Sequence, residues 1–264
     1  MSCPQMVVLD LDDTTVPTNG TTPSAAVRAA LKRVLDAGSH LVFATGRSAL
    51  GTLPVLDEIG LTGGTAFASN GAIRIDIATR ELTELTTVDA AVAIPAFREL
   101  FPGAQFAAEV CGKGHLVTET FGGYGLSGEQ VSCTLGDLAA TTPPRLIIWW
   151  PEHSVAQMRD RIAGLELPGL GWSLDHTLPW LTVSAAGVTK AWAVEGLRRE
   201  LGVPREATLA IGDGDNDVEL LQWAAVGVAM GQAPEAVRQA ADWVTSPFTA
   251  DGVATAIDQS FTYS

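Results

Sequence analysis

Carboxylates in two short loops are the side chains of this chain best placed for chemistry. The first group, Asp10-Leu11-Asp12-Asp13-Thr14, directly follows the apolar run Val7-Val8-Leu9. Because open α/β sheets bind ligands at the carboxyl ends of their strands, carboxylates at this point face a ligand. Asp10 and Asp12 can then divide the work, since one carboxylate can attack while the other transfers protons. Taken alone, such a pattern is more often a solvated acidic turn.

The second group, Gly212-Asp213-Gly214-Asp215-Asn216-Asp217, follows Leu209-Ala210-Ile211 in the same way. Its glycines allow a sharp turn, and its oxygen ligands suit Mg²⁺, which proteins hold with one or two carboxylates, water and phosphate. The six aspartates of the two loops would repel one another without a cation. A calcium site is the alternative for this loop alone, but the glutamate of an EF-hand loop is missing and the flanks are strand and helix.

The elements that position these loops alternate between strand and helix patterns. Thr22 suits the N-cap and Pro23 the first position of a helix that ends at Gly38. The other expected strands are 41–44, 66–68, 209–211 and 226–230, and the other expected helices are 189–201, 218–224 and 235–241. This alternation predicts an α/β fold, with a Rossmann-like parallel sheet and helices on both of its faces.

The middle of the chain has a different pattern. From about Glu81 to Ala186, strand-like runs alternate apolar and polar residues between Gly-rich and Pro-rich breaks, and Arg145 to Trp150 is a strong strand candidate. We therefore expect a catalytic core from residues 1–80 and 187–264, and an inserted α+β cap domain from residues 81–186. Such a cap would exclude water from the site and select the leaving group.

The overall composition is typical of a globular protein with a sizeable core. The 264 residues are 47% hydrophobic and 17% charged, with a formal net charge of -14. A surface this negative repels nucleic acids, so no nucleic-acid partner is expected. No apolar run approaches the ~20 residues that cross a bilayer, so no membrane partner is expected. The N-terminus lacks a signal-peptide pattern, which predicts a cytoplasmic protein. Cys3, Cys111 and Cys133 are too scattered for a zinc site or a disulfide framework.

Four motifs, in order along the chain, resemble those of the haloacid dehalogenase superfamily of phosphohydrolases. They are the D-x-D-x-T sequence from Asp10 to Thr14, Thr45 after the second strand, Lys190 at a helix start, and G-D-G-x-N-D from Gly212 to Asp217. Two further segments resemble its Cof-type branch, whose caps belong to subfamily IIB. They are Ser69-Asn70-Gly71 and the tail from Val228-Ala229-Met230-Gly231 to Asp251-Gly252-Val253.

The resemblance implies a role for each matching residue. Asp10 would be the nucleophile that forms an aspartyl-phosphate, and Asp12 the acid and base, while Thr45 and Lys190 would bind the transferring phosphoryl oxygens. Substrate and phosphate binding would involve Thr45, Gly46, Arg47, Asn70, Lys190 and Asn216. The cofactor would be Mg²⁺, held by Asp10, the Asp12 carbonyl, Asp213, and Asp217 or Asn216.

The function implied is a magnesium-dependent phosphatase of small phosphorylated metabolites, with sugar phosphates expected. A phosphomutase on the same core and a non-catalytic sensor of phosphometabolites are the alternatives, and the presence of Asp12 argues against the sensor. A dehalogenase would not need Asp12 or the dense magnesium loop. A monomer or a weak homodimer is expected.

Some positions are left open by the sequence. Asp13 stands where the family usually has glycine, and Thr15 where it usually has an apolar residue, so the role of Asp13 is undecided. Arg47 either reaches the phosphate or pairs with an acidic neighbour. Packing is the default expectation for the residues that could line the substrate pocket, which are Trp149, Trp150, His115 and His176.

Overall fold

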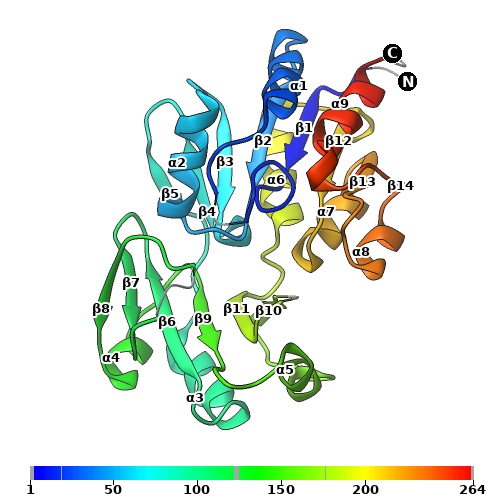
Figure 1. Ribbon diagram of the computed structural model, residues 1–264. Coiled ribbons are helices and arrows are strands. Elements are labelled where there is room, and N and C mark those ends of the chain that lie inside the picture. The colour runs from blue at the N-terminus through cyan, green and yellow to red at the C-terminus, as the bar shows by residue number, and fades with distance from the viewer. Residues whose placement is uncertain (1–2, 19, 122–124, 176, 263–264) are drawn as a thin grey trace.

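The computed structural model describes residues 3–18, 20–121, 125–175 and 177–262, and within those ranges the strands form two sheets (Figure 1). The first sheet has the order β14-β13-β12-β1-β2-β3-β4-β5. Its strands are β1 (Met6–Leu9), β2 (His40–Ala44), β3 (Thr65–Ala68), β4 (Ile73–Asp76), β5 (Leu82–Glu84), β12 (Thr208–Gly212), β13 (Val226–Ala229) and β14 (Trp243–Val244). It is parallel from β14 to β3, and β4 and β5 add antiparallel pairs at one edge.

Helices cover both faces of the first sheet, as the alternation predicts. They are α1 (Ala25–Asp36), α2 (Ala49–Ile59), α6 (Lys190–Leu201), α7 (Val218–Trp223), α8 (Glu235–Ala240) and α9 (Gly252–Thr262). Val7 and Leu9 of β1 pack in one core with α1, α2 and α9, whereas Met6 and Val8 pack in a second core with α6, α7 and α8. Alternate residues of a strand point to opposite faces, so a strand buried on both sides is apolar throughout. The predicted α/β fold with a Rossmann-like sheet is confirmed.

The second sheet comes from the middle of the chain and lies beyond one end of the first (Figure 1). Its order is β10-β11-β9-β6-β7-β8, with strands β6 (Gln105–Val110), β7 (Gly114–Val117), β8 (Glu129–Ser132), β9 (Leu146–Trp149), β10 (Leu170–Leu174) and β11 (Trp180–Ala185). The helices α3 (Ala90–Leu100), α4 (Leu135–Ala139) and α5 (Val155–Ile162) pack on one face of it. The other face is therefore available to meet the first sheet.

Trp149 and Trp150 point to opposite faces of this second sheet, as predicted for neighbours on a strand. Trp150 is buried in the core under the helices, and its Nε1 donates to the Pro102 carbonyl at 2.9 Å. Trp149 lies on the other face, with its ring centroid 5.7 Å from that of Phe121.

The first helix begins later than the sequence pattern predicts. Ser24, not Thr22, is the N-cap, and its hydroxyl oxygen accepts from the Val27 N–H at 3.1 Å. Ser24 also donates to Asp251 at 2.6 Å, a contact across the fold that a local pattern cannot reveal. Pro23 therefore stands before the cap and not inside the first turn.

The chain passes between the two sheets at two points along its length. β5 pairs with β4, so the chain leaves the first sheet only after Glu84, a few residues beyond the predicted boundary at 80. It returns to the first sheet's helices at Lys190. The division into a core and a cap domain remains our interpretation. Among the described residues, no helix is long and apolar enough to span a membrane.

A buried polar group lies on the face of the second sheet that is free of helices. Glu109 of β6 is directly opposite His115 of β7, and Arg145, just before β9, forms an ion pair with Glu109. His115 is 2% exposed, and neither ring nitrogen has a hydrogen-bond partner in the described part of the chain. Burial lowers the pKa of His115 to about 4, and the Arg145 charge acts in the same direction.

This depressed pKa predicts a specific acid sensitivity. The unfolded chain, with a histidine pKa near 6.5, binds the proton more readily than the fold, so stability is lost as the pH falls through 6.5 towards 4. Between pH 7 and pH 5 the loss from His115 is about 2 kcal/mol. His115→Leu should remove this part of the decline, which urea denaturation at both pH values would measure. Equal declines in the variant and the wild type would contradict it.

Candidate active site

Three aspartates converge where the two predicted loops meet. Asp10 follows β1, and its N–H donates to the Ile211 carbonyl of the neighbouring β12 at 3.0 Å. Asp213 directly follows β12, and Asp217 is the last residue of the short 3₁₀ turn Asp215–Asp217. One carboxylate oxygen from each of Asp10, Asp213 and Asp217 lies within 4.8 Å of the others, and all three residues are buried. The fold thus assembles the acid cluster that the sequence predicts.

Lys190 is the cation of this cluster. It is the first residue of α6, where the Thr189 hydroxyl caps the helix by accepting from the Trp192 N–H. Its Nζ donates to Oδ1 of Asp10 at 2.6 Å and to Oδ1 of Asp217 at 2.7 Å, and the residue is 1% exposed. Although burial alone would lower it, the two carboxylates raise the pKa of Lys190 above its ordinary value. The amine therefore stays charged.

The carboxylates of the cluster are buried and lie close enough to repel one another. Burial raises the pKa of Asp10 well above its ordinary value, and the charges of Asp217 and Asp213 add to this while Lys190 opposes it. Burial, followed by the charge of Asp217, raises the pKa of Asp213 to about 6. One lysine therefore does not neutralise the cluster.

This donor set fits Mg²⁺. The oxygens are hard ligands that converge from two loops, and the three buried carboxylates share a single lysine, Lys190, so the cluster can accept a cation. Asp217 is the most constrained member, since its Oδ1 accepts from Lys190 and its Oδ2 accepts from the N–H groups of Asp213 and Gly214. A Cβ at Gly212 would overlap the Asp217 carboxyl carbon, which explains the glycine at the end of β12.

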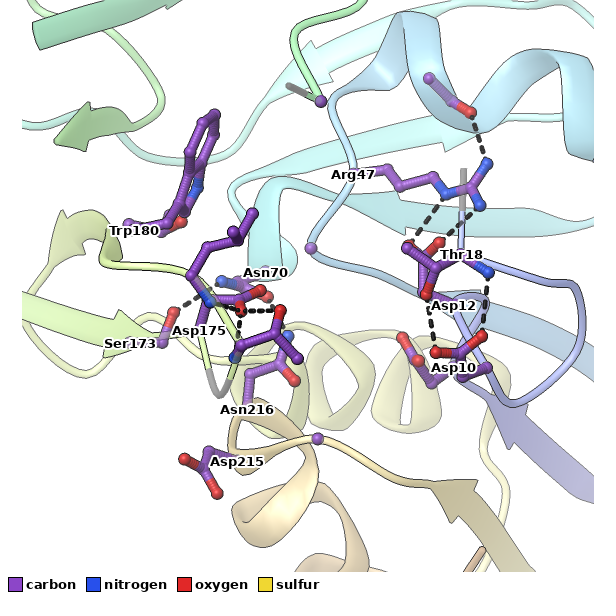
Figure 2. Close-up of a pocket in the computed structure, with 18 of the residues that line it drawn as sticks. Asp10, Asp12, Thr18, Arg47, Asn70, Ser173, Asp175, Trp180, Asp215 and Asn216 are labelled. Atoms are coloured by element: carbon purple, nitrogen blue, oxygen red, sulfur yellow. Dashed lines mark hydrogen bonds and ion pairs between the residues drawn. The ribbon is translucent and has the colours of Figure 1, made fainter. Parts of the chain in front are cut away.

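Asp12 lies at the side of the cluster and pairs with Arg47. Arg47 Nη2 donates to Oδ1 of Asp12 at 2.6 Å, and Nε donates to Oδ2 at 2.9 Å, so the pair is bidentate (Figure 2). The sequence left open whether Arg47 reaches the phosphate or pairs with an acidic neighbour, and the structure shows it paired with Asp12. The Arg47 N–H donates to Oγ1 of Thr45 at 3.1 Å, which ties the pair to the loop after β2.

A network of amides connects the remaining predicted residues. The Asn70 N–H donates to the Thr45 carbonyl at 2.9 Å, and Asn216 Nδ2 donates to Oδ1 of Asn70 at 2.9 Å. A Cβ at Gly46 would meet both of these side-chain amides at 3.3 Å, so glycine suits this close approach. Thr45 is fully buried, so its side chain lies beneath the pocket surface and not on it.

Asp13 has a structural role in this arrangement. Its backbone is left-handed, with φ at 48°, a conformation that glycine adopts easily and that aspartate tolerates better than most residues. Its carboxylate accepts from the Thr18 N–H at 2.9 Å and from the Thr18 hydroxyl at 2.7 Å, which closes the loop. The departure from glycine at this position therefore preserves the backbone conformation.

A pocket of about 630 Å³ opens above these residues, between the two parts of the chain. The first part contributes Asp10, Asp12, Gly46, Arg47, Asn70, Asp213 and Asn216, and the second contributes Arg145, Ser173, Asp175, Leu178, Trp180 and Thr182. Figure 2 shows Trp180 and Ser173 across the pocket from Asp12 and Arg47. The wall opposite the acid cluster is thus built by β10, β11 and the connection between them.

The sequence did not identify this opposite wall. Among the described residues, the pocket lining does not include Trp149, Trp150 or His115, which agrees with the expectation that these side chains pack in the interior. His176 lies outside the described residues. Trp180, and neither Trp149 nor Trp150, is the tryptophan that lines the pocket among the described residues. The alternation of apolar and polar residues along β11 was the available signal, but it does not show which face meets the first sheet.

Comparison with known proteins places this chain in a family. A sequence model of the haloacid dehalogenase-like hydrolases matches residues 7–107 and 174–257, more than half of the chain. The chain belongs to this family. The matched ranges contain Asp10, Thr45, Lys190 and the loop from Gly212 to Asp217.

Similar proteins agree with this family membership. A phosphoglycolate phosphatase of Methanoculleus marisnigri is 28% identical over 260 residues, which cover 97% of each chain. A phosphatase of the haloalkanoate enzyme superfamily from Bacteroides thetaiotaomicron has a solved structure with a TM-score of 0.80 at 25% identity, covering 98% of this chain and 95% of that chain. A subclass IIB sugar phosphatase has the same fold, with a TM-score of 0.80 at 22% identity and coverage of 97% and 98%. The predicted family and its enzyme class, hydrolases of phosphoric monoesters, are confirmed.

Proposed function

We propose that this hydrolase is a magnesium-dependent phosphatase that forms an aspartyl-phosphate on Asp10. The observation that carries the proposal is the environment of the Asp10 carboxylate, which lies at the floor of the pocket with Lys190 on its Oδ1. Within the described residues no hydrogen bond reaches Oδ2 of Asp10, which leaves that oxygen for attack on a phosphorus atom. Asp12 lines the same pocket two residues further along the chain.

The residues divide the reaction between them. An oxygen of Asp10 forms a bond to phosphorus while the bond to the leaving oxygen breaks, and Asp12 donates a proton to that oxygen. Water then attacks phosphorus, Asp12 accepts its proton, and the bond to Asp10 breaks with release of inorganic phosphate. Lys190 and the Thr45 to Arg47 loop bind the phosphoryl oxygens, since phosphoryl transfer depends mainly on positioning and on stabilisation of charge.

The metal ligands that we propose are Asp10, Asp213 and the main-chain carbonyl of Asp12. Asp217, whose oxygens already accept from Lys190 and two backbone N–H groups, orients the amine and the loop around it. When bound, Mg²⁺ supplies positive charge that offsets the repulsion among the carboxylates and the phosphoryl oxygens.

The substrate that we propose is a small phosphate monoester, with a sugar phosphate as the first candidate. A pocket of about 630 Å³ is within the usual range for small-molecule sites. The polar groups of Ser173, Thr182 and Asp175 beside the Trp180 ring suit a hydroxylated leaving group. Phosphate release from a panel of sugar phosphates and phosphoglycolate, with and without Mg²⁺, tests the proposal. No release from any member or from a general aryl phosphate would reject it.

Magnesium is expected to stabilise the fold. At 100 times its Kd, Mg²⁺ adds about 2.7 kcal/mol to the native state, and for a chain of this size that raises Tm by roughly 5–10 °C. Asp213→Asn should abolish most of this rise, and should not lower Tm in chelator because it removes one repelling charge. Asp215→Asn is the matched control, since Asp215 lines the pocket outside the buried cluster. A Tm that is independent of Mg²⁺ in the wild type would contradict the metal site.

Three expectations about the whole protein stay predictions. These are a cytoplasmic location, a monomer or weak homodimer, and no nucleic-acid or membrane partner. The small phosphorylated metabolite is the partner that the family and the pocket support.

A further inference from the structure

A buried ion pair connects the second sheet to the loops of the first. Nε of Arg145 donates to Oε2 of Glu109 at 2.7 Å, and the two side chains are 5% and 2% exposed. Charges withdrawn from water to this extent need further hydrogen-bond partners to offset the loss of hydration. Those partners show which other segments of the chain the ion pair contacts.

The hydrogen-bond partners of this ion pair lie in the loop, turn and helix segments that connect strands of the first sheet. Oε2 of Glu109 also accepts from the Ser69 hydroxyl at 2.6 Å, and Oε1 accepts from the Ala49 N–H at 3.3 Å. Arg145 Nη1 donates to the Gly46 carbonyl. The pair therefore contacts the loop after β2, the first residue of α2 and the 3₁₀ turn Ser69–Gly71.

One of these segments is the loop that the proposed mechanism uses to bind phosphate, and another carries Asn70, which the family resemblance assigns to substrate and phosphate binding and whose N–H donates to the Thr45 carbonyl. Gly46 lies between Thr45 and Arg47, and Ser69 precedes Asn70. Ser69 and Asn70 are consecutive non-glycine residues in the left-handed region, with φ at 53° and 55°. Such conformations cost free energy and persist only where surrounding contacts hold them. Glu109 supplies one of those contacts to Ser69.

We propose that Glu109 and Arg145 are positioning residues, through which the inserted part of the chain holds the 45–47 loop and the 69–71 turn in their phosphate-binding conformation. The inference rests on the proposed function. It gives the second sheet a role in binding the phosphoryl group, beside its role in forming the wall that faces the leaving group. Loss of the pair should then weaken phosphate binding equally for every substrate, whatever the leaving group.

The double variant Glu109→Leu with Arg145→Met tests this directly. Replacing both members of a buried ion pair with apolar residues of similar volume is often neutral for stability, so the fold is expected to survive. Inorganic phosphate is the probe, because it binds as the product and has no leaving group. We expect its inhibition constant, and KM for all substrates, to rise by between about tenfold and a hundredfold, with the ranking of substrates unchanged.

Three further variants make the result specific. Ser69→Ala removes the hydroxyl that Glu109 accepts from, leaves the ion pair intact and keeps a Cβ at the positive φ, so the turn still needs support, and it should raise the phosphate inhibition constant by a smaller factor. This variant decides the question if the double variant does not fold. Trp180→Leu should change the ranking of substrates and leave the phosphate constant alone. Glu119 accepts from Gln105 within the second sheet, so Glu119→Gln should change neither the ranking nor the phosphate constant.

The outcomes separate this inference from the proposed function. A folded double variant with wild-type phosphate affinity would overturn the inference, as would an altered substrate ranking at unchanged phosphate affinity, which would make Arg145 a leaving-group contact. A lower Tm with wild-type KM and phosphate affinity would also overturn it, since the pair would then be structural only. If the wild type binds phosphate with Mg²⁺ but turns over nothing, the proposed function fails, and calorimetric phosphate affinities of the variants still decide the inference.

Discussion

Replacing Asp10 by asparagine is expected to reduce phosphatase turnover by at least about 10³-fold, equivalent to ~4 kcal/mol in the activation barrier. An amide oxygen does not attack phosphorus as a carboxylate does, whereas the side chain keeps nearly the same shape. The amide can still accept from Lys190, which donates to Asp10 at 2.6 Å. Burial, with the charges of Asp217 and Asp213 adding to it, raises the pKa of Asp10, so a neutral side chain here should not lower the melting temperature in the absence of metal.

The comparison that makes this result specific is Asp215→Asn, which removes a pocket aspartate outside the buried cluster and should keep turnover within about tenfold. Initial rates on an aryl phosphate at saturating Mg²⁺ measure both variants. Borohydride trapping of a phosphorylated carboxylate, followed by mapping of the modified peptide, gives an independent readout. Asp10→Asn turnover within tenfold of the wild type would reject Asp10 as the nucleophile.

Asp12→Asn is expected to slow turnover by roughly 10²–10⁴-fold, the range typical of general acid–base catalysis. The amide cannot donate the acidic proton or accept one from water. Its oxygen can still accept one of the two hydrogen bonds from Arg47, so the loop should keep its position. Metal and phosphate affinities are therefore expected to stay close to those of the wild type.

The leaving group distinguishes an acid from a residue that only positions others. A nitrophenolate needs little protonation when it departs, whereas an alkoxide needs much. Rapid-mixing measurements of the first step should show a smaller loss for nitrophenyl phosphate than for an alkyl phosphate in the Asp12→Asn variant. If both substrates lost the same factor, Asp12 would not be the acid, and its ion pair with Arg47 would become its main role.

The parts of the site that the sequence predicted are those read from local patterns. Asp10 and the loop from Gly212 to Asp217 each follow a short apolar strand, and the edge of a parallel sheet brings such loops together without further information. Lys190 was found because it matches a family motif, and the structure places its amine between Asp10 and Asp217. The catalytic roles of these residues remain our proposal.

The parts that the sequence did not predict depend on contacts between distant segments. Trp180 and Ser173 line the pocket because one face of the second sheet turns towards the first, and no pattern within residues 170–185 specifies that orientation. The ion pair of Glu109 and Arg145 could not be predicted from the sequence for the same reason, since its partners lie in loops of the first sheet. The start of α1 was predicted two residues early because Thr22 and Ser24 are both suitable N-cap residues, and the hydrogen bond from Ser24 to the distant Asp251 cannot be read from the local sequence.

The pairing of β1 with β12 also fixes the order in which the chain can be completed during its synthesis. Met6 pairs with Thr208, whereas all strands of the second sheet lie between Gln105 and Ala185. A ribosome has therefore made the whole second sheet before β12 exists, and β1 until then has only β2 beside it. The second sheet can fold first, while one edge of the apolar β1 waits unpaired. Arrival of β12 closes that edge and, in the same step, brings Asp213 and Asp217 to Asp10, so a chain that ends earlier has no acid cluster.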